Sequence, residues 1–228
     1  MARVSTDEVQ SRIASIVDQD QNTANISSGD YALRLKYMNM ALSEWQESYD
    51  WQTLYTEFNS LVSTSTGNAS IALPTDFRKL ASFPMITWDG TTTDSFPETR
   101  PQEAGRYNAT DKRIEILGNP QDAYTMRVYG VTLVSGASVK VPYYMSAQSL
   151  VSPANIAEIP NPEYLVKRSI AYLWEAREDS RFVVMKQEAE RILAQMIDYE
   201  NVFSEASTND RIKSVDEMRF GDFRWGRD

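Results

Sequence analysis

The sequence predicts an α+β fold: a four-helix bundle frame with two N-terminal and two C-terminal helices, a central antiparallel β insertion and an extended C-terminal arm. Three observations lead to this prediction. Apolar residues recur every three or four positions in both flanks of the chain, which indicates helices. The middle of the chain contains short apolar runs separated by turn residues, which indicate strands. Beyond residue 204 a polar stretch leads to the ending MRFGDFRWGRD.

Two helices are expected before the β insertion, over residues 5–18 and 30–50. Ser5 and Glu8 form an S-x-x-E capping box at the start of the first helix, and Asp30 is expected to cap the second. Each helix carries one apolar stripe, so each should bury one face. The stripes consist of Val9, Ile13, Ile16 and Val17 in the first helix and of Leu35, Met38, Leu42, Trp45 and Tyr49 in the second.

The β insertion is expected over residues 54–145, with four to six strands. Its apolar runs are separated by turn signals such as STSTGN, DG and GNPQD, which favour antiparallel pairing. The runs are 54–62, 69–73, 82–88, 113–117, 124–134 and 139–145. Because the strands are gathered between helices and do not alternate with them, the pattern favours α+β over βαβ architecture.

Two further helices are expected over residues 161–178 and 180–203. Asn161 is the predicted N-cap, and Pro162 suits the first helical position. The junction between the helices is short, so they should pack antiparallel. Neither flank holds enough helix to bury a core alone, and we therefore expect residues 1–204 to form a single domain. The stripes are Val166, Ile170, Leu173 and Trp174, and then Met185, Ala189, Ile192, Leu193, Met196 and Phe203.

The composition excludes several classes of protein. The 228 residues include no cysteine and no histidine, so neither a disulfide nor a Ser-His-Asp or Cys-His catalytic group is expected. The formal net charge of −9 disfavours a protein that binds nucleic acid by neutralising phosphates. The start MARVSTDEVQ lacks the apolar segment of a signal peptide, and no apolar run is long enough for a membrane span.

A calcium site was considered at the loop after the first helix. Asp18, Asp20 and Asn22 match the first three ligand positions of a calcium-binding loop. Thr23 and Gly29, however, stand where such a loop needs a glycine and a bidentate glutamate. The segment is therefore interpreted as a solvated loop, and we expect no metal. No glycine-rich phosphate loop is present either, so we expect no cofactor.

Carboxylates alone can support glycoside hydrolysis, and three of them lie near the junction of the last two helices. These are Glu175, Glu178 and Asp179. A hydrolase needs one carboxyl with a raised pKa. The neighbouring Arg177 and Arg181 should lower a carboxyl pKa instead, so surface ion pairing is favoured and no catalytic residue is assigned.

Residues 205–228 are expected to form a linker and a C-terminal docking arm. Aromatic residues and arginine are enriched in interface hot spots, and here they alternate near the end of the chain. Gly221 and Gly226 argue against a terminal helix. In the alternative, the tail folds back on its own domain as an edge strand, or is disordered. The residues predicted to make the contact are Arg219, Phe220, Phe223, Arg224 and Trp225.

Several segments, taken in order, carry a resemblance to a known family. They are YALRLKYMNMALSEW (31–45) followed by SYDWQTL, then LPTDFRKL (73–80), then the proline-started helix pair that begins NPEYLVKRS (161–196), and a C-terminal extension. In this order and spacing, over nearly the whole chain, the sequence resembles the head-to-tail adaptor (connector) proteins of tailed bacteriophages. Among these proteins, the sequence is distantly similar to the podovirus tail-tubular type.

The resemblance implies a structural virion protein and no enzyme. Such adaptors form a ring, commonly of twelve copies, that joins the portal to downstream tail or stopper proteins at the capsid vertex. DNA passes through the ring only as cargo, and acidic helices would repel it rather than hold it. The C-terminal arms often reach the portal. The protein would be made in the host cytoplasm and would contact no membrane.

Two alternatives remain open at this point. One is a virion-associated peptidoglycan hydrolase that uses carboxylates only, through Glu175 or Glu178. The other is a different neck component, such as a stopper or tail-completion protein. The tail also has three alternatives, since it can dock on the portal, on a neighbouring subunit or on its own domain.

Overall fold

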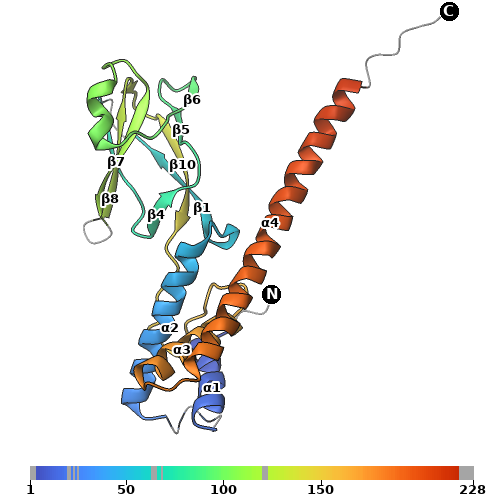
Figure 1. The fold of residues 1–228 in the computed structure, drawn as a ribbon. Coiled ribbons are helices and arrows are strands. Elements are labelled where there is room, and N and C mark those ends of the chain that lie inside the picture. The colour runs from blue at the N-terminus through green and yellow to red at the C-terminus, as the bar shows by residue number, and fades with distance from the viewer. Residues whose placement is uncertain are drawn as a thin grey trace, which may run out of the picture. The chain divides into compact units, whose positions relative to one another are not determined.

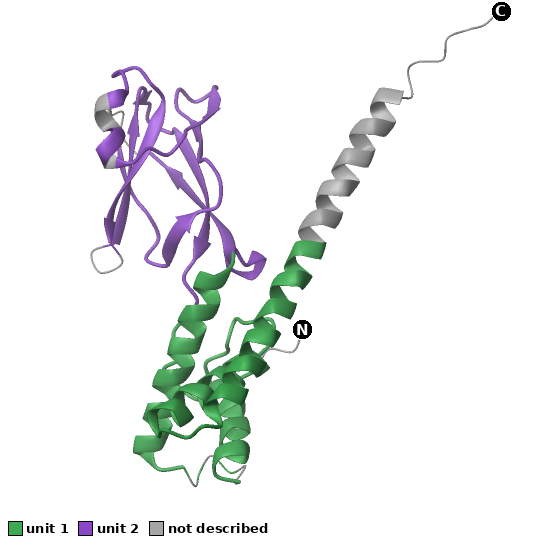
Figure 2. Cartoon of the chain, in the orientation of Figure 1, with its two compact units in different colours: residues 1–49, 148–228 green, residues 50–147 purple. Residues whose placement is uncertain are grey.

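The computed structural model describes the backbone of residues 4–19, 22, 24, 26–62, 66–67, 69–119 and 123–220, and their side chains except at 66, 67, 101, 104, 105 and 203–220. The chain divides into two compact units, which Figure 2 distinguishes by colour. The helical unit consists of Met1–Tyr49 with Gln148–Asp228, and the β unit consists of Asp50–Ala147. The predicted α+β class is confirmed, since the described residues form four α-helices and antiparallel sheets.

The helical unit contains α1 (Thr6–Val17), α2 (Ser28–Ser48), α3 (Glu163–Ala176) and α4 (Phe182–Phe220), labelled in Figure 1. The helix α3 packs against each of the other three. Most of the predicted stripes are buried, because their side chains form the core of this unit. The core includes Val9, Ile13, Met38, Leu42, Trp45, Val166, Ile170, Leu173, Trp174, Ala189, Ile192 and Met196. Among the described residues, none of the helices combines the length and apolar content that a membrane crossing requires.

The helix caps agree with the sequence at one of three starts. Ser5 caps α1 as expected, because its Oγ accepts a hydrogen bond from Glu8 N at 3.2 Å. The prediction for α2 was wrong: Ser27 is the cap, with its Oγ 3.1 Å from Asp30 N, because the helix begins earlier than residue 30. The prediction for α3 was also wrong by one residue: the helix begins at Glu163 and Pro162 is the N-cap, although Asn161 Oδ1 still accepts a hydrogen bond from Glu163 N at 3.1 Å.

The helix α4 is longer than the sequence analysis predicted. It was expected to end at residue 203, but it runs over 39 residues from Phe182 to Phe220. The segment after 204 was interpreted as a linker because it is polar, yet before Gly221 it contains no glycine or proline, the two residues that most disfavour a helix. Polarity indicates that a segment is solvated, and a solvated segment can still be helical. The helix ends directly before Gly221.

The β unit contains ten short strands in the described residues. More strands form than the four to six expected, because several have only two or three residues and give no periodic signal. A five-stranded sheet has the order β1-β10-β5-β6, with β4 also paired to β10. A second sheet has the order β3-β8-β7, and β2 pairs with β9. The strands are β1 (Tyr55–Leu61), β2 (Thr66–Gly67), β3 (Ser70–Ala72), β4 (Phe77–Leu80), β5 (Met85–Thr87), β6 (Thr93–Ser95), β7 (Arg113–Asn119), β8 (Ala123–Tyr129), β9 (Thr132–Leu133) and β10 (Ser138–Met145).

The strand β10 organises the larger sheet. It pairs with β1 along one side, and with β5 and β4 along the other. Pro142 lies between the stretches paired to β5 and β4, and its carbonyl accepts a hydrogen bond from Ala81 N at 3.0 Å. A proline is tolerated at this position of a central strand because the N–H that it lacks would face the gap between β5 and β4. The buried side chains of this unit include Phe77, Ile86, Phe96, Ile114, Met126, Val139 and Val141.

Candidate functional site

The described side chains of α4 change character along the helix. On its first part, Ala189, Ile192 and Met196 are buried in the core. Beyond Met196, the described side chains as far as Val202 are exposed or half-buried, and Tyr199 and Val202 are 51% and 63% exposed. The backbone nevertheless stays helical to Phe220. An apolar side chain exposed on a helix that continues beyond its packed part is a candidate contact for another molecule.

A pocket of about 290 Å³ lies where this change occurs. Its apolar lining residues are Pro160, which precedes α3, and Met196 and Tyr199, which lie on α4. The polar groups at its edge belong to Asn161, Gln195 and Glu200. We name the space lined by these six residues the α4 pocket. Its residues include no nucleophile with a nearby base, so its chemistry suits binding and not catalysis.

The position of the α4 pocket follows from local structure. Pro160 and Pro162 hold the entry to α3 in extended and turn conformations, and Asn161 Oδ1 accepts from Glu163 N at 3.1 Å. Nearby on α4, Asn201 Oδ1 accepts from the Tyr49 hydroxyl at 2.7 Å, which ties the helix to the end of α2. The pocket is therefore built on fixed elements of one unit.

A charged cluster joins α2 to α3 within the helical unit. Arg168 donates from Nε to Glu44 Oε2 at 2.6 Å and from Nη2 to Glu44 Oε1 at 2.7 Å, a bidentate pair. The Tyr172 hydroxyl also donates to Glu44 Oε1. The Arg168 guanidinium lies 4.5 Å from the centre of the Tyr172 ring, and Tyr37 stacks on that ring at 5.9 Å between centroids. The cluster holds the two helices together.

The pKa values in this cluster indicate a structural role. Burial acts against the charged form of Glu44, but the hydrogen bonds from Arg168 and Tyr172 outweigh it and lower the carboxyl pKa below its ordinary value. The hydrogen bond to Glu44 raises the pKa of Arg168 further. Burial, and then the hydrogen bond to Glu44, raise the pKa of Tyr172 to about 12. A carboxylate held in its charged form by three donors is a poor general acid.

The structure also shows what the three carboxylates of the hydrolase alternative do. Glu175 lies at the end of α3, Glu178 follows in the connection to α4, and both are exposed. Asp179 accepts hydrogen bonds from the Arg181 side chain at 2.6–3.0 Å, and these bonds lower its pKa. The predicted surface ion pairing is confirmed for Asp179. Glu175 and Glu178 are exposed, so neither lies in the apolar cleft that a hydrolase acid requires.

The loop considered for calcium is used for helix capping and pairing. Asp18 is the C-cap of α1 and forms an ion pair with the buried side chain of Arg34. Asn22 Oδ1 accepts from Ala24 N at 3.0 Å, and Asp20 lies outside the described residues. In the part of the chain that the structure describes, no group of three or more acidic residues could hold a metal ion.

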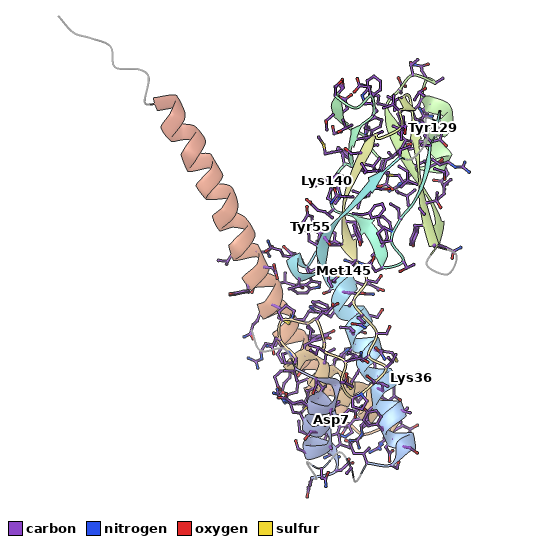
Figure 3. All side chains as sticks on the ribbon, turned by 180° about the vertical axis from the view of Figure 1, so that it is seen from behind. Asp7, Lys36, Tyr55, Tyr129, Lys140 and Met145 are labelled. Carbon is purple, nitrogen blue, oxygen red and sulfur yellow. The ribbon has the colours of Figure 1, made fainter. Side chains whose placement is uncertain are left out.

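A mixed polar and aromatic surface covers the outer side of β1 and β10. Figure 3 labels Tyr55 and Lys140 on these neighbouring strands. Lys140 Nζ lies 2.8 Å from Glu57 Oε2, and the Tyr55 hydroxyl donates to Glu57 Oε1 at 3.1 Å. The hydrogen bond from Lys140 lowers the pKa of Glu57. The charges of this face are satisfied within the unit, so the face is a weaker candidate for binding than the α4 pocket.

The predicted interface residues are only partly described. Arg219 and Phe220 lie in the last turn of α4, and nothing further is described of their side chains. Phe223, Arg224 and Trp225 lie outside the described residues. The sequence analysis missed the α4 pocket, although one signal for it was present. The spacing of Met196, Tyr199 and Phe203 continues the apolar stripe of α4 past its packed part.

Comparison with protein-family models gives a match. The family model of the SU10 adaptor protein matches residues 5–213 of this chain. The matched span includes both compact units and most of α4. No curated protein matches the chain. The family match is consistent with the predicted phage head-tail adaptor, whereas the podovirus tail-tubular type stays a prediction.

Proposed function

The chain belongs to the SU10 adaptor protein family, and on this premise we propose that it is a structural virion protein whose copies form a ring between portal and tail. The match over residues 5–213 carries this proposal. The ring would hold twelve copies and lie at the capsid vertex, and DNA would pass through its channel. Its partners would be the portal and a downstream tail or stopper protein.

The chemistry of the described residues supports a structural part. Neighbouring ionisable groups form ion pairs in which each partner stabilises the charged form of the other, as in Glu44 with Arg168 and Asp179 with Arg181. The net charge of −9 suits a channel wall that DNA passes without binding, because like charges repel. The exposed apolar side chains Tyr199 and Val202 offer the kind of surface that assembly would cover.

We also propose that the two compact units have different roles in the ring. The four helices would form the bundle frame of the ring, and the β unit would contact neighbouring or distal tail parts. Residues 1–204 would unfold as a single domain, although they include two compact units. Thermal unfolding should then show one transition, with near-UV and far-UV circular dichroism changing together. Two separated transitions would overturn the single domain.

The docking arm is proposed for residues 205–228, with Arg219, Phe220, Phe223, Arg224 and Trp225 as its contact residues. Its helical part, as far as Phe220, would carry the last eight residues to another molecule. A truncation that removes residues 218–228 should keep the melting temperature of the full chain and lose assembly. An equal loss of both would instead indicate that the tail stabilises its own domain.

Electron microscopy of the protein mixed with purified portal tests the whole proposal. Rings bound coaxially to the portal are the expected result. A protein that stays monomeric and never binds portal at high concentration would contradict it. In a particle reconstruction, density of this chain away from the portal would indicate a stopper or tail-completion protein.

A cell-wall clearing assay tests the hydrolase alternative, with Glu175→Gln and Glu178→Gln as variants. Clearing by the natural chain that these variants lose would support the alternative.

A further inference from the structure

We propose that the α4 pocket is the receptor for the Trp225 side chain of a second copy of this chain. This contact rests on the proposed ring, because it names one of the interfaces that would hold neighbouring subunits together. The pocket and the tail belong to the same chain. Three observations argue that the tail of one subunit enters the pocket of another. These observations are the size and chemistry of the pocket, the length of α4 and the sequence that follows it.

The size of the α4 pocket suits a single side chain. Its volume of about 290 Å³ lies just below the range of about 300–1,000 Å³ that is typical of small-molecule sites. Its walls are formed by a proline ring, a methionine thioether and a tyrosine ring, which are good surfaces for an aromatic group. Its lining also includes two amide side chains, Asn161 and Gln195, and an amide oxygen can accept the indole N–H of a tryptophan.

The tail of the same chain cannot reach this pocket. From Glu200, the last pocket residue, α4 continues for twenty residues to Phe220. A helix rises about 1.5 Å per residue, so its end lies about 30 Å beyond the pocket. Trp225 follows Phe220 by five residues, which span at most about 18 Å when fully extended. While α4 is continuous, Trp225 can occupy the pocket only of another molecule.

A second copy of this chain is the occupant that the sequence favours. The segment 218–228 carries three arginines and two aspartates beside its aromatic residues, a net side-chain charge of +1, and the pocket lining contributes one acidic group, Glu200, and no basic group. A contact of this kind joins two different patches, so each subunit would give its tail and receive another. Head-to-tail contacts of this type close into a ring when the rotation between subunits allows it.

Disulfide cross-linking tests the contact, because the chain contains no cysteine of its own. One variant carries Gln195→Cys at the edge of the pocket, where the side chain is exposed. The other carries Gly226→Cys, which leaves Trp225 in place. When the two are mixed and oxidised mildly, we expect a cross-linked dimer on a denaturing gel, because a disulfide forms only between cysteines whose Cα atoms approach within about 7 Å.

Two controls make the result specific. Gln187→Cys, exposed on α4 and outside the pocket lining, should give at least tenfold less cross-linked product with Gly226→Cys. Adding Trp225→Ala to the Gly226→Cys chain should reduce the product to the same low level, whereas Trp225→Phe should keep part of it. Equal cross-linking with Gln187→Cys, or no effect of Trp225→Ala, would overturn the proposal.

A chain carrying both Gln195→Cys and Gly226→Cys separates the remaining outcomes. A cross-link within one molecule at high dilution would mean that the tail folds back, and it would overturn docking between copies.

Electron microscopy of the same samples separates this inference from the proposed function. Rings without the cross-link would contradict only the pocket contact. A cross-link without rings, even with portal present, would keep the contact and contradict the proposed adaptor role.

Discussion

The first part of α4, residues 182–196, and its continuation, residues 197–220, belong to one unbroken helix but meet different surroundings. The first part buries Ala189, Ile192 and Met196 in the core of the helical unit. The described side chains of the continuation lie outside the core, with Tyr199 and Val202 more than half exposed. The same apolar periodicity is therefore buried in the core in one part and more than half exposed in the other.

The comparison shows that an apolar stripe does not by itself reveal its partner. In the first part, α3 supplies the partner, because the short connection at Asp179 brings the two helices into contact. In the continuation, helical backbone persists although the described side chains are not packed into a core. Most helical stability in proteins comes from tertiary packing, and the described part of the continuation shows little of it, which is why we propose that assembly completes the packing.

The largest expected difference between the two parts concerns the free energy of unfolding. Ile192→Ala removes a buried side chain and leaves a cavity, which should cost about 3 kcal/mol. Val202→Ala shortens a side chain that is 63% exposed and should change stability by less than about 0.5 kcal/mol. Urea denaturation followed by circular dichroism measures both. Equal losses would mean that the continuation of α4 is packed in the free protein.

A smaller effect is expected at the cluster that fixes α2 to α3, the surface on which the first part of α4 rests. Glu44→Gln removes the negative charge that Arg168 and Tyr172 bind. Hydrogen bonds to charged groups contribute about 1.5–3 kcal/mol, and because the Glu44 side chain is 40% exposed we expect a loss of about 1 kcal/mol at pH 7. Glu47→Gln, on the exposed side of the same helix, is the matched control.

The pH dependence of this cluster has a definite sign. The folded-state pKa of Glu44 is lowered, so its contribution to stability is fully present above the ordinary carboxyl value of 4.5 and is lost as the pH falls through the lowered value. The stability difference between the natural chain and Glu44→Gln should therefore shrink as the pH falls below 4.5. A difference that grows towards low pH would show that Glu44 is not held in its charged form.

How much of the fold could be predicted depended on whether the signal was local. The start of α1 and, to within one residue, that of α3 could be predicted because Ser5 and Asn161 act on backbone groups only two or three residues away. The fold class followed from the change of period between the flanks and the middle. The strand count could not be predicted, because strands as short as β2 and β9 are defined by their partners in the sheet.

The candidate site was harder to predict than the fold. The α4 pocket combines Pro160 and Asn161 with residues of α4 that follow more than thirty positions later, and only the packing of α4 brings them together. The charged cluster of Glu44 and Arg168 likewise joins residues separated by 124 positions. The aromatic and arginine-rich tail was visible in the sequence because composition alone marks it. Its role in docking stays a prediction, since Phe223, Arg224 and Trp225 lie outside the described residues.

The smallest effect on stability, and the sharpest test of the comparison, is expected from breaking the continuation of α4. Ser207→Pro removes a backbone donor and clashes with the preceding turn, which costs about 3 kcal/mol within a helix. Because we expect the helix beyond Val202 to be unpacked in the free protein, this cost should melt only the helix around residue 207. The far-UV ellipticity at 222 nm should fall, the melting temperature should stay within about 1 °C of the natural chain, and Ser207→Ala should change neither. Assembly should fail in the Ser207→Pro variant, because an interrupted helix no longer holds the tail at a fixed distance from its own α4 pocket. A large drop in melting temperature would instead show that the helix beyond Val202 is packed in the free protein and would remove the distinction between the two parts of the helix.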